Sequence, residues 1–256
     1  MTEHILTSIA DKVLHIRLNR PEKKNAITFA MYDAMADALE QADGDDAIRV
    51  ITIFGSGDAF TSGNDLADFL QPRRLDGENP ASRFLATISR AGKPLIACVN
   101  GLAVGVGVTM LLHCDLIYAA ESATFQMPFV NLGLVPEAAS SFLLPRMIGH
   151  QRAAHLFLSG ERFDAQAALG LGLVNAVYPA AALEAETRNI ATALAMKPPA
   201  AIRATKALLK ADTSAAVAAR LAKERAVFEE RLKSPEAREA MEAFLQKRAP
   251  DFSRFG

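Results

Sequence analysis

Glu137 is the residue of this sequence whose surroundings most clearly favour acid–base chemistry. It ends the run 128–137 and is followed by the largely apolar segment 138–144. A carboxylate in apolar surroundings resists ionisation, so its pKa rises toward the range in which a general base works. A second interpretation stays open here: Pro136 can begin a helix, and Glu137 would then be an acidic first-turn residue favoured by the helix dipole.

Two glycine-containing segments offer a different kind of chemistry. They are residues 60–66, which contain Gly63, and residues 99–107, which contain three glycines. A glycine or small residue just after a strand lets backbone N–H groups point into open space. Two such groups aimed at one point would stabilise a developing oxyanion. Glycine turns are also common structural features, so a purely structural role remains open for both segments.

Several familiar chemical motifs are missing from the sequence. It contains no GxxxxGK[ST], no GxSxG around any serine and no HExxH, and Gly101, Gly105 and Gly107 do not form GxGxxG. His150 and His155 are five residues apart with no neighbouring thiol or partner histidine. We therefore expect no metal site, no phosphate loop and no dinucleotide cofactor.

Composition indicates one α/β domain with an appendage. The chain has 256 residues, of which 50% are hydrophobic, which is ample for a large core. Its 28 basic and 29 acidic residues nearly cancel, so charge gives no reason to expect nucleic acid or an anionic membrane as a partner.

Cys98 and Cys114 lie in apolar runs without a CxxC, which is typical of buried free thiols in a reducing cytosol. The first residues lack a basic segment followed by an apolar stretch, and no uncharged apolar run reaches transmembrane length; we expect a cytoplasmic protein.

Strand and helix patterns alternate along most of the chain. Residues 5–19 predict a hairpin whose second strand is 13–18, and Thr28 is a candidate cap for a helix that runs to about Asp43. Buried strands are expected at 50–54, 94–100 and 115–119, a short helix before His113, and a surface loop at 72–80. Strands and helices at this spacing indicate parallel β-β-α units.

The pattern becomes purely helical from about Lys197. Val217, Leu221, Phe228 and Leu232 form an apolar stripe, and residues 234–236 (Ser-Pro-Glu) predict a helix start. Such a stripe indicates packing, either against the core or against another subunit.

Five segments in this order and spacing resemble the crotonase (enoyl-CoA hydratase/isomerase) superfamily. They are 18–21 with 25–26, then 60–66, 99–107, 169–174 and 197–199. The resemblance implies a spiral of β-β-α turns over residues 1–195 that carries an acyl-CoA site, and a helical trimerisation region at 196–256. It also implies trimers, often paired as hexamers, and an acyl-CoA thioester as ligand, so coenzyme A would be part of the substrate and no separate cofactor is expected.

The same resemblance assigns tentative roles to individual residues. The oxyanion donors would be the backbone N–H groups of Asn64 and Val106. Coenzyme A would contact the backbone around Ser62, Asn64 and Leu66, with Lys24 near its phosphates. Phe228 and Lys247 match positions that in some members contact coenzyme A from a neighbouring subunit.

Two positions distinguish this chain from the hydratases of the family. Hydratases carry two glutamates where this sequence has Thr109 and Phe129. Adding water requires acid and base groups within hydrogen-bond reach; Phe129 supplies none and Thr109 is a poor substitute. Hydration is therefore disfavoured, and replacing Thr109 by alanine is expected to matter little.

The run 128–141, together with residues 62–66, resembles the peroxisomal-type Δ3,Δ2-enoyl-CoA isomerases. Those enzymes carry a single catalytic glutamate at the position of Glu137. The expected reaction is a one-base proton shift, with Phe129 and Leu132 in the acyl pocket excluding water. Hydration or another reaction of the family, such as dienoyl-CoA isomerisation, is the alternative enzymatic interpretation. A non-catalytic CoA-ester binding protein is the alternative of another class.

Overall fold

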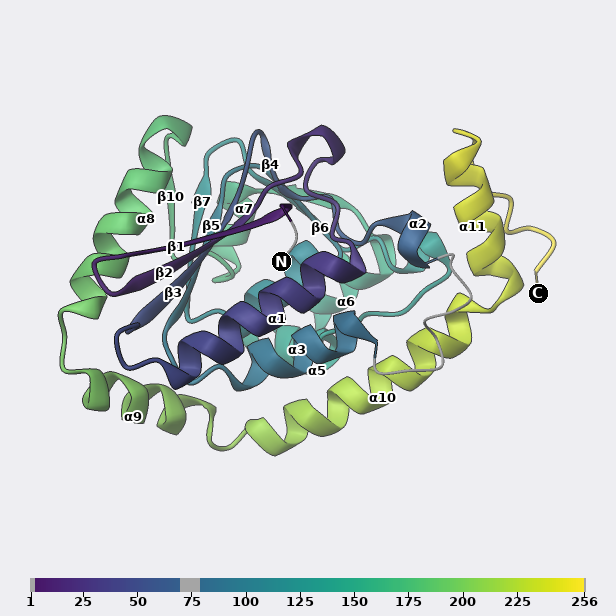
Figure 1. Ribbon diagram of the computed structural model, residues 1–256. Coiled ribbons are helices and arrows are strands. Elements are labelled where there is room, and N and C mark those ends of the chain that lie inside the picture. The colour runs from purple at the N-terminus through teal and green to yellow at the C-terminus, as the bar shows by residue number, and fades with distance from the viewer. Residues whose placement is uncertain (1–2, 70–78, 256) are drawn as a thin grey trace.

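Two β-sheets frame the protein, whose computed structural model describes residues 3–69 and 79–255 (Figure 1). The six-stranded sheet has the order β1 (Ile5–Ala10), β2 (Val13–Leu18), β3 (Val50–Gly55), β5 (Leu95–Val99), β7 (Leu116–Ala120) and β10 (Ala176–Tyr178). The four-stranded sheet has the order β4 (Ala59–Thr61), β6 (Leu102–Val104), β8 (Thr124–Gln126) and β9 (Arg162–Asp164). Among the described strands, β1–β2 and β8–β9 pair antiparallel, and the other neighbours pair parallel.

Each turn of the chain adds one strand to each sheet. The pairs β3/β4, β5/β6, β7/β8 and β9/β10 are consecutive along the sequence and divide between the two sheets. This is the predicted spiral of β-β-α units, and the fold class is confirmed. Sequence patterns missed the second sheet because its strands are three residues long, too short to show a period of two.

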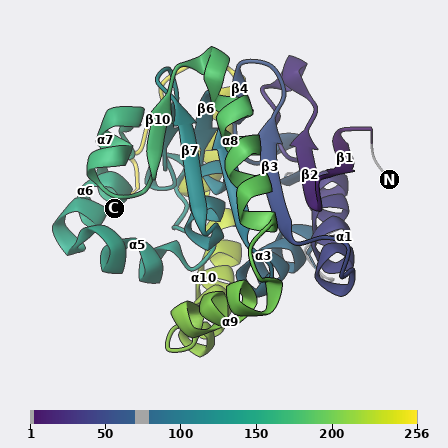
Figure 2. The same cartoon turned by 90° about the vertical axis from the view of Figure 1, so that its left-hand side faces the viewer.

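Helices cover both faces of the six-stranded sheet. The helix α8 (Ala180–Ala195) lies across one face, and α1 (Phe29–Gly44) and α3 (Pro80–Arg90) lie on the other side (Figure 2). Strands β3 and β5 are therefore buried along their whole length and read as continuous apolar runs rather than alternating ones. The predicted hairpin, the helix from Thr28 and the three buried strands are confirmed, and the Thr28 hydroxyl accepts the N–H of Met31.

The start of α3 corrects one sequence expectation. Residues 72–78 of the predicted loop lie outside the described residues, but Pro80 is the first residue of α3, and Asn79 caps the helix by accepting the N–H of Ala81. Proline is favoured at the first position of a helix because its missing N–H would have had no helical partner.

Short helices connect the strands around the centre of the molecule. They are η1 (Pro21–Lys23), α2 (Leu66–Phe69), α4 (Val106–Thr109), η3 (Met110–His113), η4 (Val130–Leu132), α5 (Ser140–Ile148), α6 (His150–Ser159) and α7 (Ala165–Gly170).

Cys98 is buried and Cys114 half-buried, and both are free thiols, as expected; burial raises the pKa of each to about 12. Among the described residues, no helix combines the length and apolar character needed to cross a bilayer.

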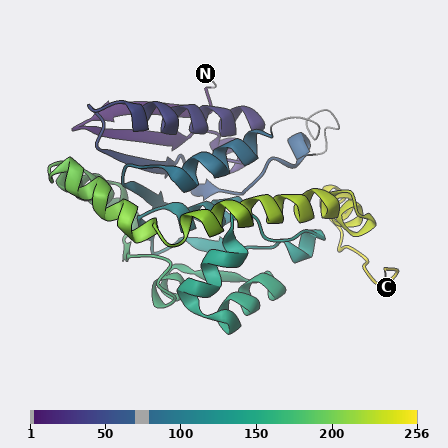
Figure 3. The same cartoon turned by 90° about the horizontal axis from the view of Figure 1, so that it is seen from below.

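The C-terminal helices are α9 (Pro199–Lys210), α10 (Ser214–Leu232) and α11 (Pro235–Leu245). The long helix α10 crosses between α3 and α5 and packs against both (Figure 3). Val217 is buried, and Leu221, Phe228 and Leu232 pack against the hydrophobic core of their own chain. The stripe predicted from the sequence therefore covers this chain's own core.

Candidate active site

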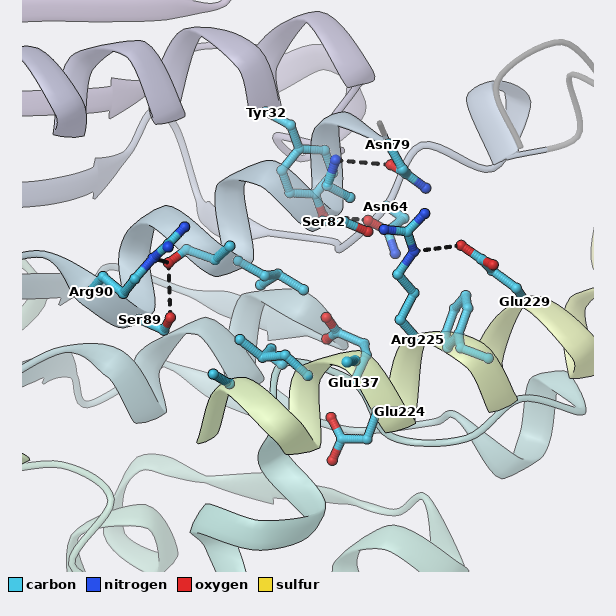
Figure 4. Close-up of a pocket in the computed structure, with 18 residues that line it drawn as sticks. Tyr32, Asn64, Asn79, Ser82, Ser89, Arg90, Glu137, Glu224, Arg225 and Glu229 are labelled. Atoms are coloured by element: carbon cyan, nitrogen blue, oxygen red, sulfur yellow. Dashed lines mark hydrogen bonds and ion pairs between the residues drawn. The ribbon is translucent and has the colours of Figure 1, made fainter. Parts of the chain in front are cut away.

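A cavity of about 310 Å³ lies between α3 and α10. Tyr32 and Asn64 lie on one side of it, and Glu137 and Glu224 lie on the opposite side (Figure 4). Small and apolar side chains form most of the remaining wall. The full lining is Tyr32, Asn64, Asn79, Ala81, Ser82, Leu85, Ala86, Ser89, Arg90, Glu137, Ala138, Ala218, Leu221, Ala222, Glu224, Arg225, Phe228 and Glu229.

Glu137 faces this cavity from the segment between η4 and α5. Its carboxylate accepts a hydrogen bond from the Thr109 hydroxyl. The pKa of Glu137 is raised to about 7: burial raises it most, the hydrogen bond from the Thr109 hydroxyl lowers it, and the nearby Glu224 carboxylate raises it. A carboxylate with this pKa changes protonation near neutral pH, as a general base must.

The structure excludes the interpretation of Glu137 as a first-turn helix residue. The helix α5 begins at Ser140, three residues after Glu137. Between them Ala138 and Ala139 both have left-handed backbone angles, with φ of 60° and 56°. Residues 137–140 therefore form a turn, closed by the Ser140 N–H donating to the Glu137 carbonyl at 3.1 Å, and Glu137 at its start lines the cavity.

Contacts from distant elements hold this turn. Glu224 of α10 accepts the N–H of Ala139 at 2.6 Å, the N–H of Ser141 at 3.0 Å and the Ser141 hydroxyl at 2.5 Å. On the other side, His113 Nε2 donates to the Ala138 carbonyl at 2.8 Å. Burial lowers the pKa of His113 to about 4, so the ring is neutral and its single N–H serves this bond.

Glycines bring the two predicted oxyanion segments together. A Cβ atom on Gly63 would meet the Val104 carbonyl oxygen at 2.9 Å, and one on Gly107 would meet the Thr61 side chain at 2.5 Å. Only glycine permits this approach of residues 61–63 to residues 104–107. The neighbours Asn64 and Val106 are thus carried on two segments that touch through their backbones.

The backbone N–H groups of both expected oxyanion donors, Asn64 and Val106, lie outside the local backbone hydrogen bonds. In the parallel bridge between Ile27 and Asn64, the hydrogen bonds use the Gly63 carbonyl and the Asp65 N–H, so the N–H of Asn64 points away from Ile27. Val106 is the first residue of α4, where N–H groups have no partner within the helix. The Tyr32 hydroxyl donates to the Asn64 side-chain oxygen, which fixes that side chain in the cavity wall.

Three of the predicted site residues line the same cavity: Asn64, Glu137 and Phe228. Phe228 lines the cavity of its own chain, whereas the resemblance suggested a neighbouring subunit. Phe129 is only 5% exposed within the core and Leu132 packs against the core. The described lining includes neither, and their role in the acyl pocket stays a prediction.

The remaining predicted residues lie outside the cavity lining. Ser62 donates its N–H to the Lys24 carbonyl, and the Lys24 ammonium pairs with Asp58 at 2.6 Å. Leu66 is the first residue of α2, and its side chain lies outside the described part of the chain. Lys247 is exposed just after α11. The coenzyme A contacts assigned to these residues stay predictions.

Sequence reasoning missed two polar neighbours of Glu137 and assigned a minor role to a third, which stays a prediction. Glu224 stands three residues after Leu221 and four before Phe228, in the apolar stripe of α10. A charge in such a stripe was the available signal. Tyr32, on a predicted helix, gave none. Thr109 was expected to matter little, yet it contacts the Glu137 carboxylate directly.

Glu137 is also less solitary than the sequence suggested, since Glu224 and Glu229 line the same cavity. Both of these carboxylates are occupied by other partners. Glu224 accepts the three hydrogen bonds described above, and Glu229 pairs with Arg225 at 2.7 Å. Among the three, Glu137 is the carboxylate whose recorded partner is a single neutral hydroxyl.

The spiral fold and this site define an enzyme class: the chain belongs to the enoyl-CoA hydratase/isomerase family, whose model matches residues 8–254. The resemblance noted from the sequence is confirmed. A crystal structure of an enoyl-CoA hydratase/isomerase from Pseudoalteromonas atlantica superposes with a TM-score of 0.95 at 44% identity, covering 98% of this chain and 100% of that one.

Characterised relatives carry different activities in their names. Enoyl-CoA delta isomerase 2 of Rattus norvegicus is 40% identical over 213 residues, which cover 80% of this chain and 54% of the rat protein. The chain thus spans about half the length of that relative. The 2,3-dehydroadipyl-CoA hydratase of Escherichia coli is 35% identical over 251 residues, covering 97% of this chain and 98% of that protein.

Proposed function

We propose that this protein is a Δ3,Δ2-enoyl-CoA isomerase that uses one base. The observation that carries the proposal is the state of Glu137: it faces the cavity with a pKa raised to about 7, while the other two cavity carboxylates are engaged. The position at which a hydratase would place its second glutamate holds Phe129, a core residue. The named isomerase relatives support the same assignment.

The proposed reaction moves a proton between two carbons of the acyl chain. Ionised Glu137 takes a proton from C2 of a 3-enoyl-CoA, and the electron pair of the broken bond spreads over C2, C4 and the thioester oxygen. The N–H groups of Asn64 and Val106 stabilise the charge on that oxygen. Glu137 then returns the proton to C4, and the double bond ends between C2 and C3. No water enters, so one carboxylate is enough.

Residues around the base have supporting roles in this proposal. The Thr109 hydroxyl fixes one carboxylate oxygen of Glu137 and leaves the other for the proton. Tyr32 holds the Asn64 side chain, and Leu221 and Phe228 supply apolar wall. Water excluded by such a wall cannot compete for the dienolate.

Hydration is the second candidate. The Escherichia coli relative named as a hydratase and the presence of Glu224 in the cavity favour it. Against it, Glu224 already accepts two backbone N–H groups and a hydroxyl, which leaves it poorly placed to activate water. A non-catalytic CoA-ester binding protein is the third candidate.

We further propose that the enzyme acts as a homotrimer or a dimer of trimers in the cytoplasm. The exposed apolar side chains of α9, Leu208 and Leu209, at 77% and 79% exposure, support burial in an assembly. Lys24, Ser62, Leu66 and Lys247 remain the proposed contacts of coenzyme A.

A panel of CoA thioesters tests the proposal. The purified protein is incubated with 3-enoyl-CoA and, separately, with 2-enoyl-CoA of the same chain length. We expect 3-enoyl-CoA to gain the absorbance of the conjugated thioester, and 2-enoyl-CoA to keep it. Faster loss of that absorbance from 2-enoyl-CoA would identify a hydratase. Binding without turnover of either ester would identify a binding protein.

A further inference from the structure

The turn after Glu137 is a strained piece of backbone that requires external support. Ala138 and Ala139 are consecutive left-handed residues, and neither is glycine. A residue with a side chain is unfavourable in this conformation unless its surroundings compensate. Both residues are fully buried, so any N–H or carbonyl left without a partner there would add a further cost.

Glu224 supplies the support from a helix more than 80 residues away in sequence. One carboxylate oxygen accepts the Ala139 N–H, and the other accepts both donors of Ser141. The side chain is deep in the molecule, since the residue is only 6% exposed. The donors belong to Ala139, the second of the left-handed residues, and to Ser141 beyond it, so the contacts fix how the chain leaves the turn.

A carboxylate is required at this place because every group facing it is a donor. Glutamine has one oxygen and one NH₂ group. In a Glu224→Gln variant, the NH₂ group would therefore face either the Ala139 N–H or the two donors of Ser141. At least one buried backbone N–H would lose its acceptor.

Other charged and titratable groups lie close to this turn and to the cavity. Arg220 donates to the Ser141 hydroxyl oxygen at 3.2 Å. Burial raises the pKa of Glu224, while the hydrogen bonds from Ser141 and Ala139 and the charge of Arg220 oppose that rise. His113 holds the opposite end of the turn through the Ala138 carbonyl. The titratable and charged groups that face Glu137 and Glu224, or share their cavity, are Tyr32 of α1, Arg90 of α3, His113 of η3 and Arg220, Arg225 and Glu229 of α10.

We propose that Glu224 is a positioning residue, which holds the turn at 138–141 in its left-handed form and so keeps the Glu137 carboxylate facing the cavity. The inference rests on the proposed role of Glu137 as base. It makes the C-terminal helix α10 part of the catalytic apparatus, because the helix that covers the cavity also fixes the base inside it.

Loss of this contact should affect turnover more than binding. A displacement of a catalytic group by about 1 Å can cost on the order of 10²-fold in rate. Within the described part of the chain, the hydrogen bonds of the Glu224 carboxylate go to Ala139 and Ser141, and none goes to a residue proposed to bind coenzyme A. We expect kcat of Glu224→Gln to fall about 10- to 100-fold with KM nearly unchanged.

The experiment compares Glu224→Gln with two further variants of the full chain. Glu230→Gln is the matched control, since Glu230 is an exposed glutamate of the same helix outside the cavity lining. Ser141→Ala removes one of the three donors and tests the contact if Glu224→Gln does not fold. For each we would measure kcat and KM with 3-enoyl-CoA, thermal unfolding, and the titration of Glu137 by ¹³C NMR, assigned with Glu137→Gln.

The inference expects three results together. Glu224→Gln loses turnover, and the Glu137 titration moves to lower pH, both because a neighbouring negative charge is gone and because the turn no longer holds Glu137 in its buried position. Ser141→Ala keeps the Glu224 charge, so it shows only the effect of the loosened turn, at smaller size. Glu230→Gln behaves as wild type. Wild-type kcat and an unmoved Glu137 titration in Glu224→Gln would overturn the inference, even if thermal stability falls. If the wild type isomerises nothing, the proposed function fails, and the Glu137 titration in Ser141→Ala, which keeps the Glu224 charge, decides whether the contact positions the turn.

Discussion

Glu137 and Glu239 are two carboxylates that the fold removes from bulk water, and they reach opposite electrostatic states. Glu239, on α11, is 3% exposed, and it pairs with Arg248 at 2.5 Å and with Arg254. The hydrogen bond from Arg248 is the first cause that lowers the pKa of Glu239, to about 2. Burial raises the pKa of Glu137 to about 7, because its hydrogen-bond partner is a neutral hydroxyl and its charged neighbour is another carboxylate.

The difference shows that the partners of a withdrawn carboxylate decide its role. Arginines make the charged form of Glu239 permanent, which suits an anchor for the C-terminal segment, where the Asp251 N–H also donates to it. Glu137 has no cation among its recorded partners, so it can gain and lose a proton near neutral pH. The following predictions test this comparison, from the largest expected effect to the smallest.

Removing the proton-transfer group should have the largest effect. We expect Glu137→Gln to lower isomerase kcat by about 10²- to 10⁴-fold, because the amide cannot take the C2 proton. Affinity for a CoA thioester should be kept, since glutamine preserves the shape of the cavity wall. Steady-state kinetics and calorimetric titration with a CoA ester would check both. Near-normal turnover would refute the assignment of the base.

Glu239→Gln should lower stability and leave turnover unchanged, the reverse of the effect expected for turnover in Glu137→Gln. Two arginines would lose the charge that they share, so thermal unfolding should begin several degrees lower while kcat stays at the wild-type value. The folded-state pKa of Glu239 is depressed, so its contribution to stability is present above about pH 4.5 and is lost as the pH falls toward 2. Unfolding curves at neutral and acidic pH would measure it. An equal loss of turnover would contradict the division between anchor and base.

The stability contributed by Glu137 should depend on pH with the opposite sign. Its folded-state pKa is raised from 4.5 to about 7, so wild-type stability falls as the pH rises through that interval. Glu137→Gln mimics the protonated acid and avoids this loss. We expect the two proteins to be equally stable below pH 4.5, and the variant to gain about 1–3 kcal/mol by pH 8. Denaturant titrations across this range would show the divergence, and a constant difference would count against it.

Thr109→Val should produce the smallest effect, and it sharpens the role of the hydroxyl. The Thr109 hydrogen bond lowers the pKa of Glu137, so its removal should move the acid limb of the pH–rate profile to higher pH. Turnover at neutral pH would then fall by about tenfold or less. The profile of kcat/KM against pH is the measurement. An unmoved acid limb would support the earlier expectation that Thr109 matters little.

Much of the frame could be predicted because it depends on local patterns. Apolar runs such as 50–54 and 115–119 were recognisable as buried strands, and Thr28 as a cap, because these signals lie within a few residues of one another. The three-residue strands of the second sheet were not predictable, since their pairing with distant strands, rather than their own pattern, defines them.

The residues of the candidate site also fall into those that the local sequence identifies and those that only the fold places there. Glu137 and the glycine segments could be found from residue types and spacing, but Tyr32, Thr109 and Glu224 could not be placed beside them. Their contacts with the site span 28 to 85 positions of sequence, and nothing local records such a distance. Conversely, Phe129 and Leu132 are close to Glu137 in sequence, yet the described cavity lining includes neither.

The amino-acid sequence by itself determined the spiral α/β frame, the family and the identity of the candidate base, because these depend on short-range order and spacing. Only the tertiary structure decided what kind of carboxylate Glu137 is. Its pKa follows from burial and from the hydroxyl and carboxylate that α4 and α10 bring to it. Those neighbours exist only when the chain is folded, since electrostatic interactions depend on distance in space and not on distance along the chain.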